Sequence, residues 1–521
     1  GKKVLQVMQN KKNVILSIIA ILALSILLIG ATFAYFQAQG NTGSITETKV
    51  TTYTTDTLSF ETGDPLTFTI DQENFAEGKG NLSSNTYAKA ILTANNKTNT
   101  ATEHYYVYLN ISNNTFKYTQ NENTPEILLT IKDASGIELT SISGLAYKTV
   151  TDGKGTNISG FDITTKNGLI ALLSNKKITA TPNKTDEWNI TITFVNYNAD
   201  QSANAGNSFI AKLITQKNEV VLLKDYILSE YTGTQGENSL YYHDSTLANG
   251  AGDNSYRYAG PSDSVNNFVC FGSTIIPCPT DNLYRIIGII NDKVKLIKYD
   301  YATRNLLGKD GDYEGFSSPN ATYYKGSLTS ISNYRWNYKA DTANYNNTWS
   351  TSLLNKTNLN TDFINNIGTE WANKIAMTTW KVGGNTWNNI AVVKPSITYQ
   401  NEIVSPDVTN STDNAIEYNA QIGLMYVSDY GFATMPSDWT KAMNSYEETV
   451  DNNWMHMGVS EWTITRRSDG STNAFLVDSN GVLYHYSPSH SSNAVRPVFN
   501  LESSVTYKSG FGTQSDPIII N

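Results

Sequence analysis

The chain has 521 residues, with 38 basic and 47 acidic side chains and a formal net charge of −9. It carries no basic cluster outside its N-terminus, so it lacks the surface that phosphate backbones require, and nucleic acid is not expected as a partner. Abundant Tyr, Thr and Asn together with only 16% charged residues are typical of an extracellular protein built mainly from β-strands. The length predicts two to four domains.

The first feature along the chain is an uncharged apolar run from Val14 to Phe36, which follows a lysine-rich N-terminus. At about 1.5 Å per residue this run gives a helix of roughly 34 Å, enough to cross a hydrocarbon core of about 30 Å. The lysines predict that the short N-terminus lies inside the cell and the bulk of the chain outside. The expected membrane or assembly helix includes six large apolar residues that would make its contacts: Val14, Ile18, Leu22, Ile26, Ile29 and Phe33.

This segment has three possible roles: a cleaved signal peptide, a permanent anchor, or a helix that packs into a filament core. The run is longer than the roughly 7 to 15 apolar residues of a typical signal peptide. It resembles the N-terminal helix of type IV pilins, although those proteins commonly carry Glu at the fifth mature position, where this chain has Leu5. The resemblance implies that copies of the chain leave the membrane and associate through this helix. We favour a filament subunit over a monomeric anchored adhesin.

Residues 41–217 are predicted to form an antiparallel β-sandwich. Apolar and polar residues alternate with a period of two in several segments, and Gly, Pro, Asn and Asp separate them. About seven short strands over this length indicate a two-sheet sandwich. The alternating segments are residues 57–70, 87–96, 103–112, 126–133 and 187–198.

Two stretches of this region carry a resemblance to known proteins. Residues 30–36 read GATFAYF, and residues 188–214 read WNITITFVNYNADQSANAGNSFIAKLI. Both are similar to surface proteins of Firmicutes, including biofilm-fibre proteins of the camelysin type. The resemblance implies a structural or assembly module without catalysis.

Residues 218–236 are predicted to link two domains. Val220, Leu223 and Ile227 lie at helical spacing within 219–230, and a stretch rich in Gly and Thr follows at 231–236. We expect a short packed helix and then a loop.

Residues 237–521 are predicted to form a second, α+β domain. Eight of the nine tryptophans lie here. Residues 358–376 carry Phe363, Ile367, Trp371 and Ile375 at helical spacing, with Asn360 or Thr361 as the N-cap. Residues 283–300 near the start and 494–507 near the end read as strands that pair with each other.

Cys270 and Cys278 are the only cysteines, and they bracket the short segment CFGSTIIPC. In an oxidising exterior this spacing favours a local disulfide over two free thiols. A metal centre requires more thiols or histidines at ligand spacing, so no metal and no cofactor is expected.

The second domain resembles a large set of bacterial surface domains related to the C-type-lectin-like fold, which formylglycine-generating enzymes share. The matching motifs are NFVCFG at 267–272, IGLMYVSDYGFA at 422–433, EWTITRRSDG at 461–470 and AVRPVFNL at 494–501. The resemblance implies a rigid scaffold whose late loops face a ligand. No cysteine follows Cys278, whereas the catalytic members use late cysteines, so we expect no enzyme. Arg496 is expected to serve the scaffold by satisfying carboxylates or carbonyls inside the fold.

The candidate ligand surface is the loop region from Arg466 to Asn493. Rigid aromatic and planar cationic side chains suit stacking on sugars or anchoring of protein contacts. The ligand-binding candidates are Trp462, Arg466, Arg467, Tyr484 and Tyr486. The alternative for the aromatic residues among them is a place in the core, and this alternative is favoured for the tryptophan. Two histidines of this region, His485 and His490, are read as solvated loop residues. The sequence therefore predicts an extracellular bacterial surface protein that displays a domain for binding a glycan or a protein.

Overall fold

The computed structural model describes residues 56–71, 74, 79–95, 99–121, 123–308, 334–337, 346–407, 415–487 and 492–521. The predicted helix at 14–36 lies outside these residues. Within the described ranges, no helix combines the length and the apolar character needed to cross a membrane. This part of the chain is mainly β, with 39% strand and 18% helix, as the composition predicts. It divides into two compact units between Glu219 and Val220.

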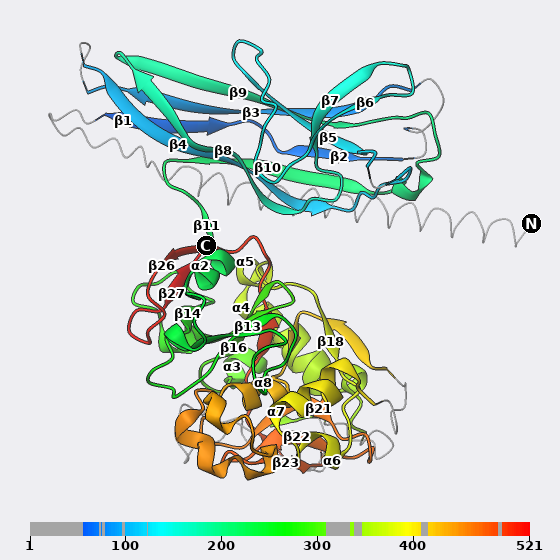
Figure 1. Ribbon diagram of the computed structural model, residues 1–521, viewed down its shortest axis with the longest axis vertical. Coiled ribbons are helices and arrows are strands. Elements are labelled where there is room, and N and C mark those ends of the chain that lie inside the picture. The colour runs from blue at the N-terminus through cyan, green and yellow to red at the C-terminus, as the bar shows by residue number, and fades with distance from the viewer. Residues whose placement is uncertain are drawn as a thin grey trace, which may run out of the picture. The chain divides into compact units, whose positions relative to one another are not determined.

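The described part of the first unit contains two sheets with sandwich-like packing (Figure 1). The six-stranded sheet has the order β1-β3-β9-β5-β7-β6, and the four-stranded sheet has the order β2-β10-β4-β8. The strands are β1 (Thr57–Thr62), β2 (Leu66–Thr69), β3 (Leu82–Thr93), β4 (Ala101–Asn114), β5 (Ile127–Asp133), β6 (Tyr147–Thr151), β7 (Asn157–Asp162), β8 (Gly168–Ala180), β9 (Asn183–Phe194) and β10 (Ser208–Gln216). All their described pairings are antiparallel.

The period of two in the sequence produces the core of this unit. Successive side chains of a strand point to opposite faces, so alternate apolar residues collect on one side. In β9, Trp188, Ile190, Ile192 and Phe194 are buried while the residues between them are more exposed. Both sheets contribute such residues to one apolar cluster. The prediction of an antiparallel sandwich over this region is confirmed at the level of its sheets, although several strands are longer than expected.

The second unit is organised around a ten-stranded mixed sheet. Its main path is β11-β26-β27-β14-β15-β16-β25-β20, and β12 and β13 join it through β15. The strands are β11 (Val221–Leu222), β12 (Leu240–His243), β13 (Ser255–Tyr258), β14 (Phe268–Cys270), β15 (Leu283–Ile290), β16 (Lys293–Lys298), β20 (Ile422–Gly423), β25 (Val498–Asn500), β26 (Thr506–Ser509) and β27 (Ile518–Ile520).

The remaining described elements, apart from one helical turn of the first unit, belong to the second unit. Small sheets are formed by β17 (Tyr334–Arg335) with β24 (Ser492–Asn493), by β18 (Thr378–Lys381) with β19 (Glu417–Ala420), and by β21 (Glu461–Arg466), β22 (Ala474–Val477) and β23 (Leu483–Tyr486). The α-helices are α2 (Leu223–Ser229), α3 (Arg304–Leu307), α4 (Ile364–Ile367), α5 (Thr369–Ala372), α6 (Trp387–Ile390), α7 (Pro395–Tyr399) and α8 (Val427–Phe432). Other helical turns are η2 (Ser202–Asn204), in the first unit, and η3 (Glu237–Ser239), η4 (Thr280–Asn282), η6 (Trp349–Thr351), η7 (Leu354–Phe363), η8 (Gln400–Val404), η9 (Pro436–Asp438) and η10 (Met443–Asn452).

The early and late strands of the second unit pair as predicted. Leu296 of β16 lies opposite Phe499 of β25 in an antiparallel ladder. The final strand β27 also runs parallel to β14. Because strands near the end of the chain pair with strands near the start of this unit, the apolar segments at 283–298 and 498–520 belong to one core.

The segment expected to link the domains belongs instead to the second unit. Strand β11 pairs with β26, and the backbone N–H of Leu223 donates to the carbonyl of Val505. Leu223 and Ile227 are buried in the core, so the apolar stripe of α2 faces its own unit. The apolar stripe of this helix was predicted correctly. The strand that pairs with this segment, β26, lies almost at the other end of the chain.

The helix predicted over 358–376 begins earlier and is interrupted. It starts at Leu354 as the π-helix η7 and continues as α4, and Gly368 ends α4 with a φ of 82°. Asn360 is not an N-cap, because its side-chain amide donates to the carbonyl of Ile422 and accepts from the N–H of the same residue. Trp371 therefore lies on the separate helix α5.

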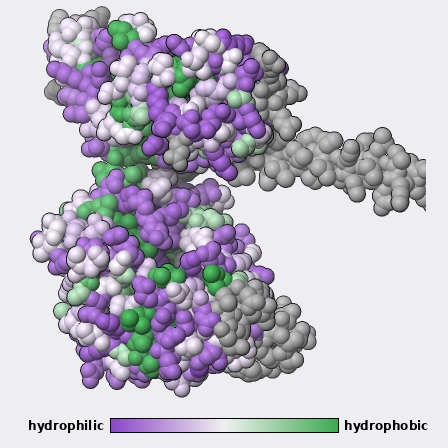
Figure 2. Space-filling view, turned by 45° about the vertical axis from the view of Figure 1, so that its right-hand side comes forward, coloured by the Kyte–Doolittle hydropathy of each residue, from purple (hydrophilic) through white to green (hydrophobic). Residues whose placement is uncertain are grey.

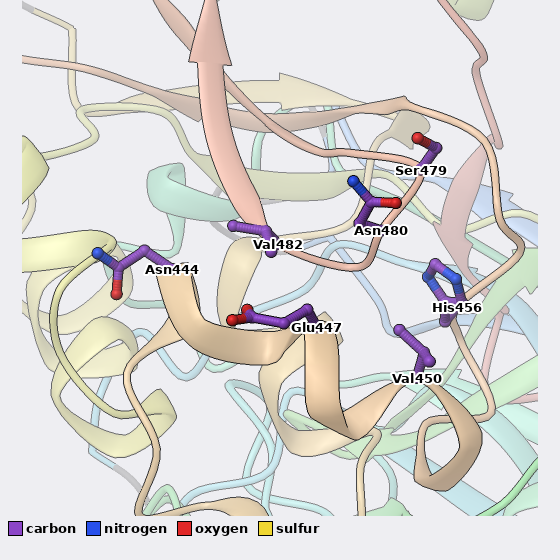
Figure 3. Close-up of a pocket in the computed structure, with 7 residues that line it drawn as sticks. All are labelled: Asn444, Glu447, Val450, His456, Ser479, Asn480 and Val482. Atoms are coloured by element: carbon purple, nitrogen blue, oxygen red, sulfur yellow. The ribbon is translucent and has the colours of Figure 1, made fainter.

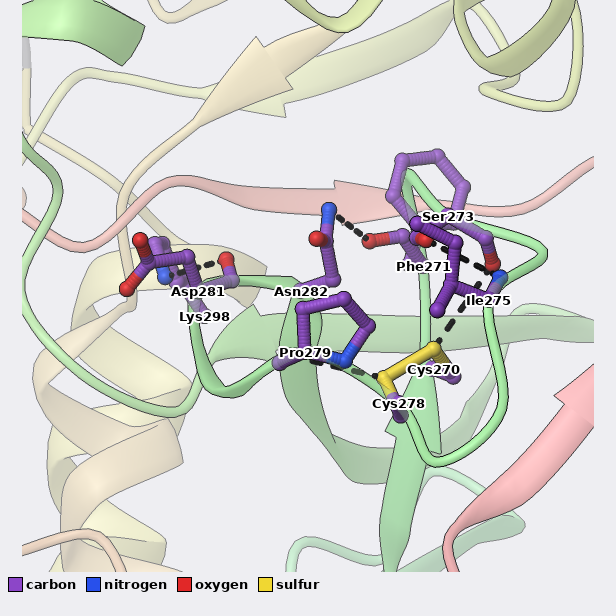
Figure 4. Close-up of a disulfide and its surroundings, with 9 residues drawn as sticks. All are labelled: Cys270, Phe271, Ser273, Ile275, Cys278, Pro279, Asp281, Asn282 and Lys298. Atoms are coloured by element: carbon purple, nitrogen blue, oxygen red, sulfur yellow. Dashed lines mark hydrogen bonds between the residues drawn. A yellow bond between two sulfur atoms is a disulfide. The ribbon is translucent and has the colours of Figure 1, made fainter.

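The disulfide between Cys270 and Cys278 is present and closes a loop directly after β14 (Figure 4). The base of the loop is held by the N–H of Phe271, which donates to the carbonyl of Asn282. Ile275 and Ile276 lie at the tip and are 65% and 71% exposed. The loop is thus fixed at its base by a covalent bond and a backbone hydrogen bond.

Replacing both cysteines with serine is expected to lower the free energy of unfolding of the second unit by about 2–3 kcal/mol, because the unfolded chain regains the freedom of the open loop. Urea titration followed by tryptophan fluorescence measures this unit, since eight of the nine tryptophans lie in it. A reducing agent should shift the wild-type midpoint and leave the variant unchanged. An equally stable double variant would show that the disulfide does not constrain the unfolded chain.

Candidate functional site

The predicted ligand surface maps onto the sheet β21-β22-β23. Phe475 of β22 lies opposite His485 of β23, and Leu476 lies opposite Tyr484. Figure 1 shows the labels β22, β23 and α6 close together at one end of the second unit. Of the five predicted binding residues, two are buried in this sheet, two are exposed on it, and Arg467 follows β21 and is half-buried.

Trp462 and Arg466 belong to the buried group, which corrects their assignment as ligand-binding residues. All six residues of β21 are buried. The indole N–H of Trp462 donates to the carbonyl of Tyr334 at 2.7 Å, and the Arg466 guanidinium donates to the carbonyl of Asp407 at 3.0 Å. Both side chains therefore donate to backbone carbonyls inside the fold, as buried polar groups usually do.

Tyr484 and Tyr486 belong to the exposed group, at 43% and 45% exposure. They lie two residues apart on β23 and therefore on the same face of the strand. Their ring centroids are 5.3 Å apart in an edge-to-face arrangement. His485 stacks on Tyr484 at 5.1 Å.

Trp387 completes the cluster from α6. Its ring meets Tyr484 edge to face at 6.0 Å and His485 at 5.2 Å. It also stacks on Phe475 at 6.2 Å, which connects the exposed rings to the core. Trp387 could not be predicted from the sequence, because no local pattern connects α6 with a strand so far along the chain. The N-cap Thr386, whose side chain accepts from the N–H of Asn389, was the only signal of a helix start there.

Arg467 and Asp469 form a polar edge beside these rings. Nε and Nη2 of Arg467 donate to the two carboxylate oxygens of Asp469 at 2.9 and 2.8 Å, which is a bidentate ion pair. The hydrogen bonds from Arg467 hold the pKa of Asp469 below its usual value. The ion pair thus braces the turn that carries both residues.

His485 is neutral in this arrangement. Nη1 of Arg467 lies 2.8 Å from Nε2 of His485, and because a guanidinium only donates, Nε2 must accept and Nδ1 carries the proton. Burial and the charge of Arg467 lower the pKa of His485. Its remaining nitrogen, Nδ1, is buried without a hydrogen-bond partner in the described structure. An imidazole held this way acts as a structural spacer between the rings and the ion pair.

A buried amide holds the turn between β21 and β22. Nδ2 of Asn347 contacts the carbonyl oxygens of Arg467, Gly470 and Asn473 at 2.7, 2.9 and 2.6 Å. The N–H of Arg467 donates to the carbonyl of Asn473. The polar edge therefore rests on an anchored turn, which keeps the rings and the ion pair in fixed positions.

We call the group of Trp387, Tyr484, His485 and Tyr486 with the Arg467–Asp469 ion pair the aromatic platform. It offers ring faces to apolar surfaces and a charged edge to hydroxyl, amide or carbonyl groups. His490, the second histidine of this region, lies outside the described residues. Within the described ranges no three His, Cys, Asp or Glu side chains are grouped so as to hold a metal ion.

Arg496 has the scaffold role that the sequence predicts. Its Nε and Nη2 donate to the two carboxylate oxygens of Glu461, both at 2.7 Å, and Nη2 also donates to the carbonyl of Met455 at 2.6 Å. Both side chains are buried. This pair fixes β21, a strand of the sheet that carries the platform, to the segment that leads into β25.

Comparison with known proteins finds no matching family model, no significantly similar curated protein and no significantly similar solved structure.

Proposed function

We propose that this chain is an extracellular recognition protein of the bacterial cell surface, whose second unit binds its ligand through the aromatic platform. The observation that carries this proposal is the pair of half-exposed rings, Tyr484 and Tyr486, held edge to face beside Trp387. Solvent-exposed aromatic groups that are fixed in place and grouped are typical of interaction sites. The proposed activity is binding, without catalysis.

A glycan chain is the ligand that suits this chemistry best. The C–H faces of a sugar pack on Tyr and Trp rings, and its hydroxyls can bind to the carboxylate and guanidinium groups of Asp469 and Arg467. A protein partner is the second candidate, since exposed Tyr, Trp and Arg side chains dominate binding energy at protein interfaces. A glycan ligand and a protein ligand require different binding screens, and both screens use the same chain.

Replacing Tyr484 with alanine is expected to weaken ligand binding about tenfold or more, because a central aromatic contact contributes at least about 1–2 kcal/mol. Binding of the purified full chain to a glycan array and to immobilised cell-surface proteins measures this effect. Phe511→Ala is the matched control, since Phe511 is an aromatic residue of the same unit that is 78% exposed outside the platform. Equal losses in both variants, or no binding by the wild-type chain on either surface, would contradict the proposal.

We further propose that the segment at 14–36 assembles copies of the chain into an extracellular filament after insertion in the cytoplasmic membrane. What supports this is a long uncharged helix-forming run followed by units with a polar exterior. Figure 2 shows a face on which hydrophilic residues predominate and hydrophobic residues occur in small separate patches. The alternative is a single-pass anchored adhesin that does not polymerise.

Electron microscopy of sheared cell-surface material distinguishes these two forms of display. A filament subunit should appear in regular fibres that antibodies against the chain decorate. Recovery of the chain only from detergent-solubilised membranes would exclude the filament and leave the anchored adhesin. Either outcome is independent of ligand binding by the platform.

The finer fold assignment is also part of this proposal: a camelysin-like sandwich followed by a non-catalytic C-type-lectin-like domain. Its support is the succession of an antiparallel two-sheet unit and a mixed unit whose first and last strands share one sheet. An experimental structure of the second unit with its ligand would test both the assignment and the platform.

A further inference from the structure

A second concave site lies between η10 and the turn that joins β22 to β23. It is an open pocket of about 560 Å³, within the range of roughly 300–1,000 Å³ found for small-molecule sites. Figure 3 shows one wall on η10 and the facing wall on the turn, with His456 beside the turn. The lining residues are Asn444, Glu447, Val450, His456, Ser479, Asn480 and Val482. None of them belongs to the aromatic platform.

The facing wall of this pocket is rigid. The carboxylate of Asp478 accepts from the N–H of Asn480 at 2.9 Å and of Val482 at 3.1 Å. The hydroxyl of Tyr430 donates to the carbonyl of Gly481 at 3.0 Å. Gly481 has a φ of +84°, and a Cβ added there would lie 2.5 Å from a methyl carbon of Val450. The turn therefore sits directly against η10, and the pocket is formed without a ligand.

The polar side chains of the pocket line an open hollow, whereas buried amides elsewhere in this unit are held by the fold. Asn347 and Asn358, for example, bind backbone carbonyl groups. By contrast, five lining side chains make no side-chain hydrogen bond to any other described residue: Asn444, Glu447, His456, Ser479 and Asn480. Glu447, Ser479 and Asn480 are exposed and Asn444 and His456 are half-buried, so their donors and acceptors meet solvent in the hollow and are accessible to a polar ligand.

The chemistry of the lining selects among polar ligands. No Lys or Arg lines the pocket, so a phosphate or sulfate group would find no counter-charge. Burial and the charge of Arg496 lower the pKa of His456, so at neutral pH its imidazole is uncharged, with one donor and one acceptor. Two amides and a hydroxyl add further donors and acceptors, and Val450 and Val482 add apolar surface.

We propose that this pocket binds a neutral, hydroxyl-rich small molecule of the monosaccharide class, either free or as the terminal unit of a glycan. The amides of Asn444 and Asn480, the carboxylate of Glu447 and the imidazole of His456 bind neighbouring hydroxyl groups. The two valines contact a C–H face of the ring. This site is separate from the platform and does not depend on its function.

Saturation-transfer NMR on the full chain tests this directly, with glucose, galactose, mannose, fucose and N-acetylglucosamine as separate probes. The chain carries Tyr484→Ala and Tyr486→Ala throughout, so that no signal arises from the platform, and the detergent has no sugar headgroup. At least one sugar should receive saturation, and Asn480→Ala or Glu447→Gln should weaken its binding about tenfold. Glu448→Gln is the matched control, because the side chain of Glu448 is 77% exposed and does not line the pocket.

A second readout locates the binding site. In a chain labelled with ¹⁵N-histidine, the bound sugar should shift the imidazole resonances of His456, which His456→Gln identifies among the five histidines. The proposal is overturned if none of the five sugars receives saturation. It is equally overturned if the binding persists in Asn480→Ala, or if inorganic phosphate displaces the sugar and shifts His456. Loss of glycan binding by the platform has no bearing on any of these outcomes.

Discussion

Replacing Arg496 with methionine is expected to lower the free energy of unfolding of the second unit by about 3–5 kcal/mol, the usual cost of removing one partner from a buried ion pair. The variant leaves the carboxylate of Glu461 buried without the two hydrogen bonds that it now accepts. Burial already raises the pKa of Glu461, and loss of the cation removes the main opposing effect. Urea titration followed by tryptophan fluorescence measures the change.

Two further variants separate this effect from a general loss of packing. The double variant Glu461→Leu/Arg496→Met removes both charges and should recover most of the stability, since apolar replacement of a whole buried pair is often neutral. Asp292→Asn breaks the pair with Lys224, in which Asp292 is 79% exposed, and should change the stability by less than about 1 kcal/mol. A loss below about 1 kcal/mol in Arg496→Met would show that the buried pair is not what fixes β21 to β25.

The pH dependence of stability should change sharply when Glu402 is replaced by glutamine. Burial raises the pKa of this carboxyl from 4.5 to about 7. Between these values the folded protein keeps a proton that the unfolded chain releases, so stability falls as pH rises. Glu402 therefore contributes a loss of about 3 kcal/mol between pH 4.5 and pH 7, at about 1.4 kcal/mol per pH unit. In Glu402→Gln the stability at pH 7 relative to pH 4.5 should rise by that amount.

His243 should produce the opposite slope over an overlapping range. Its ring is buried between Phe432 and Trp439, and burial lowers its pKa from 6.5 to about 3. Below pH 6.5 the unfolded chain takes up a proton that the folded protein does not, so stability falls as pH falls toward 3. Between pH 4.5 and 6.5 the contributions of His243 and Glu402 therefore oppose each other.

Matched variants reveal the two slopes separately. His243→Asn retains an acceptor for the N–H of Ala251, which now donates to Nδ1 of the imidazole, and should make stability fall more steeply with rising pH. Glu402→Gln should make the stability rise more steeply with rising pH. Urea titrations at pH 4.5, 5.5, 6.5 and 7, chosen to cover the two windows, compare both variants with wild type. Parallel curves for all three chains would mean that neither group changes its pKa on folding.

The strands of the first unit could be predicted because their burial follows a local rule. In β3 and β9 every second residue enters the core, and this alternation is visible in the sequence itself. Strand β21 obeys no such rule. Its sequence is EWTITR, in which the polar residues look exposed, but the strand is buried on both faces. Thr463 and Thr465 are buried there because their hydroxyls donate to the carbonyl of Phe475 and to the carboxylate of Glu402.

The candidate site could be predicted only in part for the same reason. Tyr484, Tyr486 and Arg467 could be named as candidates because aromatic and planar cationic groups gather in one late segment, and the two tyrosines are exposed in the structure. Trp462 was named as a candidate although the core was favoured for each tryptophan, and it is buried. Trp387 was missed because its place beside Tyr484 results from tertiary packing between α6 and β23. Local sequence contains no record of such a contact.

The most direct test of the central claim is adhesion by living cells that display the chain. Cells producing wild type and cells producing Tyr484→Ala/Tyr486→Ala are compared on surfaces coated with the ligand, with equal surface amounts established by antibody labelling. The double variant is expected to reach the surface normally and to adhere no better than cells without the chain. Equal adhesion by the two kinds of cell would contradict recognition through the aromatic platform.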